Sequence, residues 1–355
     1  MLARIFAPLL FSAIGAGSAF GANEAPLVRT DRHIDLASRE RLFVREVSRR
    51  GASDHGAAVL LIHGARVPGV ASFDLPVAGG SLAADLADAG YRIYIPDLRG
   101  YGRSSRPDAM NRDPAGSAPL MRTADAVSDL KAVVEAVAAW SGDDKIDIVG
   151  WATGGHWTGA YASIYPASVG RLVLYNTLYG GSDTHPTLGR GSPLEDKQNE
   201  GTFDAKSFGG YRFNNRASLF PAWDASIPVE DKSRWRDARI AEAYADAALA
   251  SDETAGTHKP ASFRSPSGAM ADSFELAIGK KQWSAEALSM PVLVIRSERD
   301  FWSRQADAEA IVAQAPDAQL LTIPDATHFV HLDRDEAGRA VFLSALLRFL
   351  PPNED

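Results

Sequence analysis

The stretch that decides the fold runs Ile146-Asp147-Ile148-Val149-Gly150-Trp151-Ala152-Thr153-Gly154-Gly155 and continues as His156-Trp157-Thr158-Gly159-Ala160-Tyr161. A mostly apolar run ends at Gly150, two more glycines follow three residues later, and a segment typical of a helix begins. Glycine has no Cβ and tolerates the backbone conformations of a tight turn. The pattern therefore predicts a strand, a sharp turn and a helix, with Ala152 in the middle of the turn.

Strand and helix patterns also alternate along the chain on both sides of this stretch. A continuous apolar run at residues 57–62 is typical of a strand buried on both faces, and further strands are predicted at residues 91–96, 172–175, 291–295 and 319–323. Apolar residues at helical spacing predict helices at residues 81–89, 123–140, 306–315 and 338–350, and alternating residues in 32–47 predict a hairpin. Strands that alternate with helices favour an α/β fold, in which helices flank a mostly parallel sheet and the crossovers are right-handed.

One long segment, residues 180–287, interrupts this alternation. It is rich in Gly, Ser, Asp, Lys and aromatic residues and contains one clear helical pattern, at 235–249. No run within it predicts a strand as clearly as the runs of the flanking regions do. We therefore expect one core, built from residues 23–179 and 288–355, and an inserted cap or lid.

The composition is that of a globular protein and excludes several classes of function. Of the 355 residues, 45% are hydrophobic and 23% are charged, values that differ from those of disordered chains and multi-span membrane proteins. The formal net charge is -8, and no cluster of Lys and Arg reverses it locally, so nucleic acid is not an expected partner. Neither a phosphate-binding glycine motif nor a metal-ligand motif occurs, so no cofactor and no metal are expected.

The N-terminus has the features of an export signal. Met1-Leu2-Ala3-Arg4 carries one positive charge, residues 5–13 are too few to span a bilayer, and Ala19 and Gly21 suit a cleavage site. We expect a signal peptide over residues 1–22, export to the periplasm or the medium, and no stable membrane insertion. A buried core helix or an anchor is the alternative. Because the chain has no cysteine, disulfides cannot stabilise it in an oxidising compartment.

Short motifs follow several of the predicted strands. They are His63-Gly64, Asp97-Leu98-Arg99-Gly100-Tyr101-Gly102-Arg103-Ser104, Gly150-Trp151-Ala152-Thr153-Gly154-Gly155, Arg296-Ser297-Glu298-Arg299-Asp300 and Ala326-Thr327-His328-Phe329. In this order they resemble the motifs of the α/β-hydrolase superfamily, over nearly all of the expected core. The central motif is similar to the nucleophile elbow G-x-S-x-G, which holds a serine hydroxyl clear of the sheet. The resemblance implies an α/β-hydrolase fold and a catalytic triad of nucleophile, acid and histidine.

Two residues take the positions of the acid and the base. Asp300 follows the strand at 291–295, and His328 lies between the last strand and the closing helix, where an imidazole can hang over the elbow. Asp300 is expected to orient His328, and His328 to accept the proton of the nucleophile. Glu298 and His331 are the neighbouring alternatives for these two roles.

The oxyanion of acyl transfer needs two hydrogen-bond donors, which in this fold are backbone amides. By position they are the amide of Thr153, directly after the elbow centre, and the amide of Ala65, directly after His63-Gly64. Arg66 and Trp151 neighbour these positions. We expect both to line the substrate pocket.

Alanine occupies the position of the nucleophile. An elbow holds its central residue in a strained conformation, and Ala152 bears that strain without catalysis in return. Since the acid, the base and the glycines all remain, we interpret Ala152 as a serine replaced on purpose, so that substrate binds without turnover. A natural pseudoenzyme that kept its pocket for binding is the alternative. Haloalkane dehalogenases and epoxide hydrolases match less well, because they require a carboxylate at this position.

The sequence thus predicts a carboxylesterase-type serine hydrolase that acts on a small or medium apolar ester through an acyl-enzyme. The present chain is predicted to be inactive or nearly so, and the expected partner is a small-molecule ester. Lactones, amides and carbon–carbon bonds next to carbonyls are alternative targets, because the same triad cleaves them. The sequence does not indicate which ester is the substrate or what the oligomeric state is.

Overall fold

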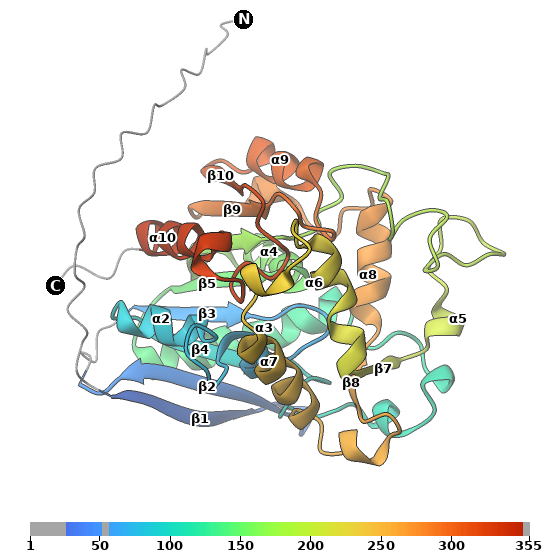
Figure 1. The fold of residues 1–355 in the computed structure, drawn as a ribbon, viewed down its shortest axis with the longest axis horizontal. Helices are drawn as coiled ribbons and strands as arrows, with labels where there is room; N and C mark the ends of the chain where they lie inside the picture. The colour runs from blue at the N-terminus through green and yellow to red at the C-terminus, as the bar shows by residue number, and fades with distance from the viewer. Residues whose placement is uncertain (1–25, 52–56, 351–355) are drawn as a thin grey trace, which may run out of the picture.

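An eight-stranded sheet forms the centre of the computed structural model, which describes residues 26–51 and 57–350 (Figure 1). The strand order is β1-β2-β4-β3-β5-β6-β9-β10. The bounds are β1 Leu27–Asp35, β2 Arg41–Arg49, β3 Ala58–Ile62, β4 Arg92–Asp97, β5 Ile146–Trp151, β6 Val169–Tyr175, β9 Val292–Ser297 and β10 Ala318–Ile323. The pairs β1·β2 and β2·β4 are antiparallel, and every later pair in this order is parallel. The predicted α/β class with a mostly parallel sheet is confirmed.

Helices cover both faces of the sheet, which explains why its central strands are apolar throughout. In β3, Val59 and Leu61 belong to one apolar cluster and Leu60 and Ile62 to the other, as the two-residue period of a strand requires. Helices α2 and α10 pack on the first face, and α3, α4 and α9 on the second (Figure 1). The helices of the core are α1 Gly69–Phe73, α2 Leu82–Asp88, α3 Thr123–Ser141, α4 Thr153–Ile164, α9 Gln305–Gln314 and α10 Arg339–Phe349.

Local sequence sets several helix ends. The hydroxyl of Ser81 accepts a hydrogen bond from the amide of Ala84 and caps the start of α2. Helix α3 ends at Gly142, which has a φ of 82°. Glycine adopts this left-handed conformation more readily than residues that have a side chain. Short 3-10 turns complete the chain: η1 Asp108–Asn111, η2 Pro114–Gly116, η3 Pro166–Ser168, η4 Arg216–Leu219, η5 Lys232–Arg234, η6 Ala255–Thr257, η7 Ala285–Ala287 and η8 Asp335–Ala337.

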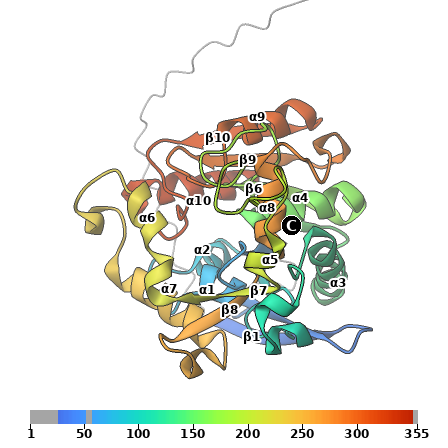
Figure 2. The same ribbon diagram turned by 90° about the vertical axis from the view of Figure 1, so that its right-hand side faces the viewer.

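The cap is formed by the segment between β6 and β9, which Figure 2 turns toward the viewer. Its elements are α5 Ala205–Phe208, β7 Tyr211–Asn215, α6 Pro221–Ser226, α7 Ala238–Ala250, β8 Ser262–Pro266 and α8 Gly268–Ala277. Strands β7 and β8 form a separate antiparallel pair, in which Tyr211 lies opposite Pro266. The sequence did not predict this pair, because both strands are short and mix polar with apolar residues.

Arg304 and Asp307, at the start of α9, tie the cap to the core. Asp307 pairs with Arg304 and accepts hydrogen bonds from the amides of residues 179–181, where the chain leaves β6 for the cap. Arg304 donates to the backbone oxygens of Leu276 and Ala277, at the end of α8. The start of the cap and the end of α8 are therefore held at one point of the core.

In the part of the chain that the structure describes, no helix has the length and apolar character needed to cross a bilayer. The predicted signal peptide, residues 1–22, lies outside the described residues.

Candidate active site

The turn between β5 and α4 has the geometry of a nucleophile elbow. Ala152 has a φ of 53° and a ψ of -116°, a conformation that residues with a side chain rarely adopt. A Cβ added to Gly150 would come within 3.0 Å of Thr158, and one added to Gly154 would come within 3.0 Å of the backbone of Ile62. Glycine is needed at both positions because α4 packs directly against β5 and β3.

The predicted acid and base lie side by side. Nδ1 of His328, in the loop after β10, lies 2.7 Å from Oδ1 of Asp300, in the loop after β9. The carboxylate of Asp300 is fully buried and also accepts hydrogen bonds from the amides of Trp302 and Ser303, each at 2.9 Å, and from the Ser303 hydroxyl. Because an ionised carboxylate only accepts hydrogen bonds, we assign the proton to Nδ1. The lone pair of Nε2 is then available as a general base.

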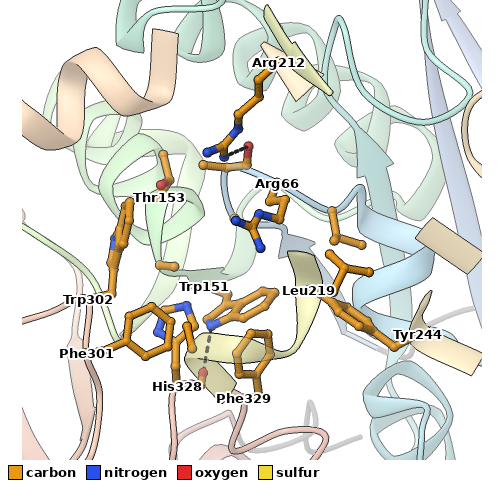
Figure 3. A pocket seen from close by; sticks show the side chains of 15 residues that line it. Arg66, Trp151, Thr153, Arg212, Leu219, Tyr244, Phe301, Trp302, His328 and Phe329 are labelled. Carbon is orange, nitrogen blue, oxygen red and sulfur yellow. Dashed lines mark hydrogen bonds between the residues drawn. The ribbon is translucent and has the colours of Figure 1, made fainter. Parts of the chain in front are cut away.

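A cavity of about 130 Å³ lies over the elbow, between the core and the cap (Figure 3). The core contributes Gly64, Ala65, Arg66, Val67, Trp151, Ala152, Thr153, Phe301, Trp302, His328 and Phe329, and the cap contributes Arg212, Leu219, Ala222 and Tyr244. Every site residue proposed from the sequence lines this cavity except Asp300, which lies behind His328. Segments far apart in the chain thus meet at one pocket.

The amides of Ala65 and Thr153 have no hydrogen-bond acceptor among the described residues. Thr153 is the first residue of α4, so its amide has no acceptor within the helix, and the positive end of the helix dipole lies there. The loop that carries Ala65 adjoins the elbow, since a Cβ on Gly64 would lie 3.5 Å from the Cβ of Ala152. Two free amides beside the nucleophile position can bind an oxyanion.

Trp151 lines the pocket and also holds the loop of the base. Its indole Nε1 donates a 3.1 Å hydrogen bond to the backbone oxygen of His328, and its ring centroid lies 5.2 Å from that of the His328 ring. Asn176 donates a second 3.1 Å hydrogen bond to the same oxygen. The position of His328 is therefore fixed by residues at the end of β5 and directly after β6.

The alternative acid and base do not reach the pocket. His331 is completely buried, and burial, followed by repulsion from His328, lowers its pKa to about 3. Glu298 is exposed and accepts a hydrogen bond from the amide of Asp325, away from His328.

Several pocket residues were not predicted from the sequence. Phe301 and Trp302 directly follow Asp300 in the chain, so extending the acid motif by two residues would have found them. Arg212 and Tyr244 come from β7 and α7 of the cap, and no sequence motif marks them. Their place in the pocket depends on how the cap folds over the core.

Within residues 26–51 and 57–350, no three His, Cys, Asp or Glu side chains come together as a metal site.

Comparisons with known proteins agree with the observed fold. A family model of the alpha/beta hydrolase fold matches residues 57–335. Polyketide synthase ThaQ of Burkholderia thailandensis is 27% identical over 301 residues, which make up 83% of this chain and 12% of ThaQ, so the chain spans a small part of that relative.

Many solved structures share the fold. The thioesterase domain from the curacin biosynthetic pathway has a TM-score of 0.58 and 16% identity, covering 90% of this chain and 99% of that domain. A thermophilic esterase from Thermogutta terrifontis has a TM-score of 0.54 and 19% identity, covering 90% of this chain and 98% of the esterase. Since the family match extends over more than half of the chain, this protein belongs to the alpha/beta hydrolase fold family.

Proposed function

We propose that this protein, with serine at position 152, is a hydrolase that cleaves a small or medium carboxylic ester through an acyl-enzyme. The present chain, with Ala152, is inactive or nearly so. One observation carries the proposal: the Asp300–His328 pair, with its 2.7 Å hydrogen bond, borders the same cavity as Ala152 and two free amides.

Each group has one role in the reaction of the Ala152→Ser protein. The introduced serine hydroxyl attacks the ester carbonyl, and Nε2 of His328 takes its proton and passes it to the leaving alcohol. Asp300 keeps the proton of His328 on Nδ1 and stabilises the imidazolium. The amides of Ala65 and Thr153 donate to the oxyanion. Water, activated by His328, then cleaves the acyl-enzyme and releases the acid.

The size and lining of the cavity support a small substrate with an apolar part. A volume of about 130 Å³ suits a group about as large as a benzene ring. Trp151, Leu219, Tyr244 and Phe329 supply apolar walls. The names of the esterase and the thioesterase with the same fold are compatible with acyl transfer. Lactones, amides and carbon–carbon bonds next to carbonyls stay as alternative targets.

A pseudoenzyme that binds a small ligand without turnover is the second candidate. The missing hydroxyl at Ala152, beside a complete pocket, favours it. In that case the protein retains the substrate-binding surface as a receptor.

Restoring the serine separates the two candidates. The Ala152→Ser protein is expected to release 4-nitrophenol from 4-nitrophenyl butyrate with a burst close to one equivalent, whereas the present chain is inert. The double variant Ala152→Ser/His328→Ala controls for activity that does not use the triad. Absence of turnover by a folded Ala152→Ser protein on esters, thioesters, lactones and amides would rule out the proposed acyl-enzyme hydrolase.

Export to the periplasm or the medium belongs to the same proposal and rests on residues 1–22. The mass of the protein from the periplasm or the medium of expressing cells tests it. Cleavage after Ala22 is expected, and a full-length chain that stays inside the cell would contradict export.

A further inference from the structure

Two arginines of the pocket have no acidic partner among the described residues. Arg66 follows the oxyanion loop of the core, and Arg212 lies on β7 of the cap; both are half-buried. Arg66 donates to the backbone oxygen of Ser218 at 2.7 Å, and Arg212 donates to Ser265 at 3.3 Å and to the backbone oxygen of Ala65 at 3.4 Å. No carboxylate of the described residues lies within ion-pair distance of either guanidinium, and no Asp or Glu lines the cavity.

Other buried arginines of this chain do have such partners. Arg264 pairs with Asp252 at 2.8 Å, Arg304 pairs with Asp307 at 2.7 Å, and Arg339 pairs with Asp335 at 2.8 Å. Burying an arginine without a counter-charge is unfavourable, so pairing is the usual solution in this protein as in others. Among the described residues, Arg66 and Arg212 lack such a pair, and both line the cavity over Ala152.

The lowered pKa values of Arg66 and Arg212 show that their positive charges are not compensated by nearby negative charge from the described part of the chain. Burial lowers the pKa of Arg66, and burial together with repulsion from Arg66 lowers the pKa of Arg212 to about 10. Both side chains stay charged at neutral pH. Guanidinium groups carry five N–H donors, and the bonds above use only some of them. Figure 3 shows the two guanidinium groups directed into the pocket, with Arg66 above the indole of Trp151.

We propose that Arg66 and Arg212 form a subsite for a carboxylate of the substrate, so that the ester bears a negative charge near its reacting carbonyl. The proposal rests on the hydrolase function above and narrows its substrate class. A carboxylate matches the planar fork of a guanidinium and can accept two hydrogen bonds from it. It would also relieve the repulsion between the two arginines. The aromatic walls then hold the apolar part of the same molecule.

A purely structural role is the competing explanation. Arg66 donates to the cap and Arg212 donates to the core, so the two bonds join cap to core. In that case the two side chains only bridge cap and core, and a charge on the ligand has no effect on its binding. The two explanations differ in whether charge on the ligand matters.

Matched substrates test the subsite in the Ala152→Ser background. Mono-4-nitrophenyl glutarate and 4-nitrophenyl valerate differ by a carboxylate on the acyl side; 4-(butanoyloxy)benzoate and phenyl butyrate differ by one on the alcohol side. Arg66→Gln and Arg212→Gln are each expected to lower the ratio of kcat/KM for the charged ester over the neutral one by roughly tenfold to hundredfold in at least one pair. Arg66→Lys keeps the positive charge, so its ratio of kcat/KM for the charged over the neutral ester is expected to fall less. Arg190→Gln, on the exposed surface of the cap, is the control and leaves the ratio unchanged.

Binding to the present chain gives a readout that needs no catalysis. Calorimetry compares the unreactive amides glutaric acid mono-4-nitroanilide and 4-butanamidobenzoate with their uncharged counterparts, valeric acid 4-nitroanilide and butyranilide. At least one charged amide is expected to bind about tenfold more tightly than its counterpart, and less tightly at high salt.

The failures of the two proposals are distinguishable. The carboxylate subsite is overturned if charged and uncharged amides bind equally well and no arginine variant changes the ratio of kcat/KM for charged over neutral esters. This holds even if Ala152→Ser hydrolyses esters. A charged amide that binds tightly and loses affinity in Arg66→Gln upholds the subsite even if Ala152→Ser is inert, in which case ester hydrolysis alone is rejected.

Discussion

The indole Nε1 of Trp151 donates a 3.1 Å hydrogen bond to the backbone oxygen of His328. The residue before the nucleophile position therefore supports the loop that carries the base. A catalytic triad works only when base and nucleophile are held at a fixed distance, so we expect this bond to matter for the proposed activity.

Trp151→Phe keeps an aromatic ring and removes this hydrogen bond. In the Ala152→Ser background we expect kcat for 4-nitrophenyl butyrate to fall about tenfold, which corresponds to about 1.4 kcal/mol for a lost hydrogen bond. Stopped-flow measurement of the acylation burst checks this. Trp140→Phe, on α3 away from the pocket, is the control, and equal rates in both variants would contradict the role of Trp151.

Asp300→Asn, also in the Ala152→Ser background, removes the acceptor that keeps the proton on Nδ1 of His328. By analogy with other triads, kcat is expected to fall by roughly a factor of 10³ to 10⁴, while the protein stays folded. Glu298→Gln changes an exposed acid of the same loop and should leave kcat within about twofold of the parent. A large loss in Glu298→Gln with little loss in Asp300→Asn would reassign the acid.

Ala152→Gly tests the strain of the elbow. Glycine adopts the observed φ of 53° and ψ of -116° without steric conflict, so the variant is expected to be more stable by about 1 kcal/mol, after the entropy of glycine in the unfolded chain is included. Ala139→Gly, on the exposed side of α3, is expected to lose about 1 kcal/mol instead. Urea unfolding of both variants measures the difference. Destabilisation by Ala152→Gly would show that the elbow is not strained.

Asp333 makes the stability of the folded protein decrease as pH rises. Burial raises its pKa to about 7, while hydrogen bonds from Thr327 and Trp223 oppose this rise. The unfolded chain releases this proton near pH 4, so between about pH 4 and 7 only the folded chain keeps it, and stability falls as pH rises. The side chain of Asp333→Asn stays neutral at every pH. Its free energy of unfolding relative to that of the parent is therefore expected to increase by a few kcal/mol between pH 5 and pH 8. Asp35→Asn, on exposed β1, is the control; an effect of Asp333→Asn that does not change with pH would contradict the shift.

His331 makes the stability of the folded protein change with pH in the opposite direction. Its pKa is lowered to about 3, whereas in the unfolded chain it is about 6.5, so below pH 6.5 the unfolded chain binds a proton that the folded chain does not. The stability that neutral His331 contributes is complete above pH 6.5 and is lost as pH falls. His331→Gln is expected to be less stable at pH 7 but to lose less stability between pH 6.5 and 4. Parallel unfolding curves for His331→Gln and the exposed control His33→Gln would contradict this assignment.

The layout of the core could be predicted from the sequence because its signals are local. Apolar runs of five or six residues mark the central strands, and the helices between them carry a clear 3.6-residue period. Strand β3 was predicted at 57–62 and forms at Ala58–Ile62, and α10 was predicted at 338–350 and forms at Arg339–Phe349. The strands of the cap were missed because β7 and β8 are stabilised by each other and by the core rather than by their own composition.

The motifs to which the elbow, the acid and the base are assigned were also readable in the chain, since each follows a strand of the core. The pocket was readable only in part. Arg66 and Trp151 adjoin motifs, but Arg212, Leu219 and Tyr244 belong to the cap, and their neighbours in space are distant in sequence.

By itself, the sequence determined the sheet, the order of the motifs and the alanine where a nucleophile belongs, because these depend on residue type and short-range spacing. Only the tertiary structure decided that Asp300 rather than Glu298 meets His328, and that His331 is buried away from the pocket. It also decided that two arginines, for which residues 26–51 and 57–350 supply no acidic partner, share the cavity over Ala152. Those relationships depend on how loops from four strands and a folded cap converge, and no local pattern encodes that convergence.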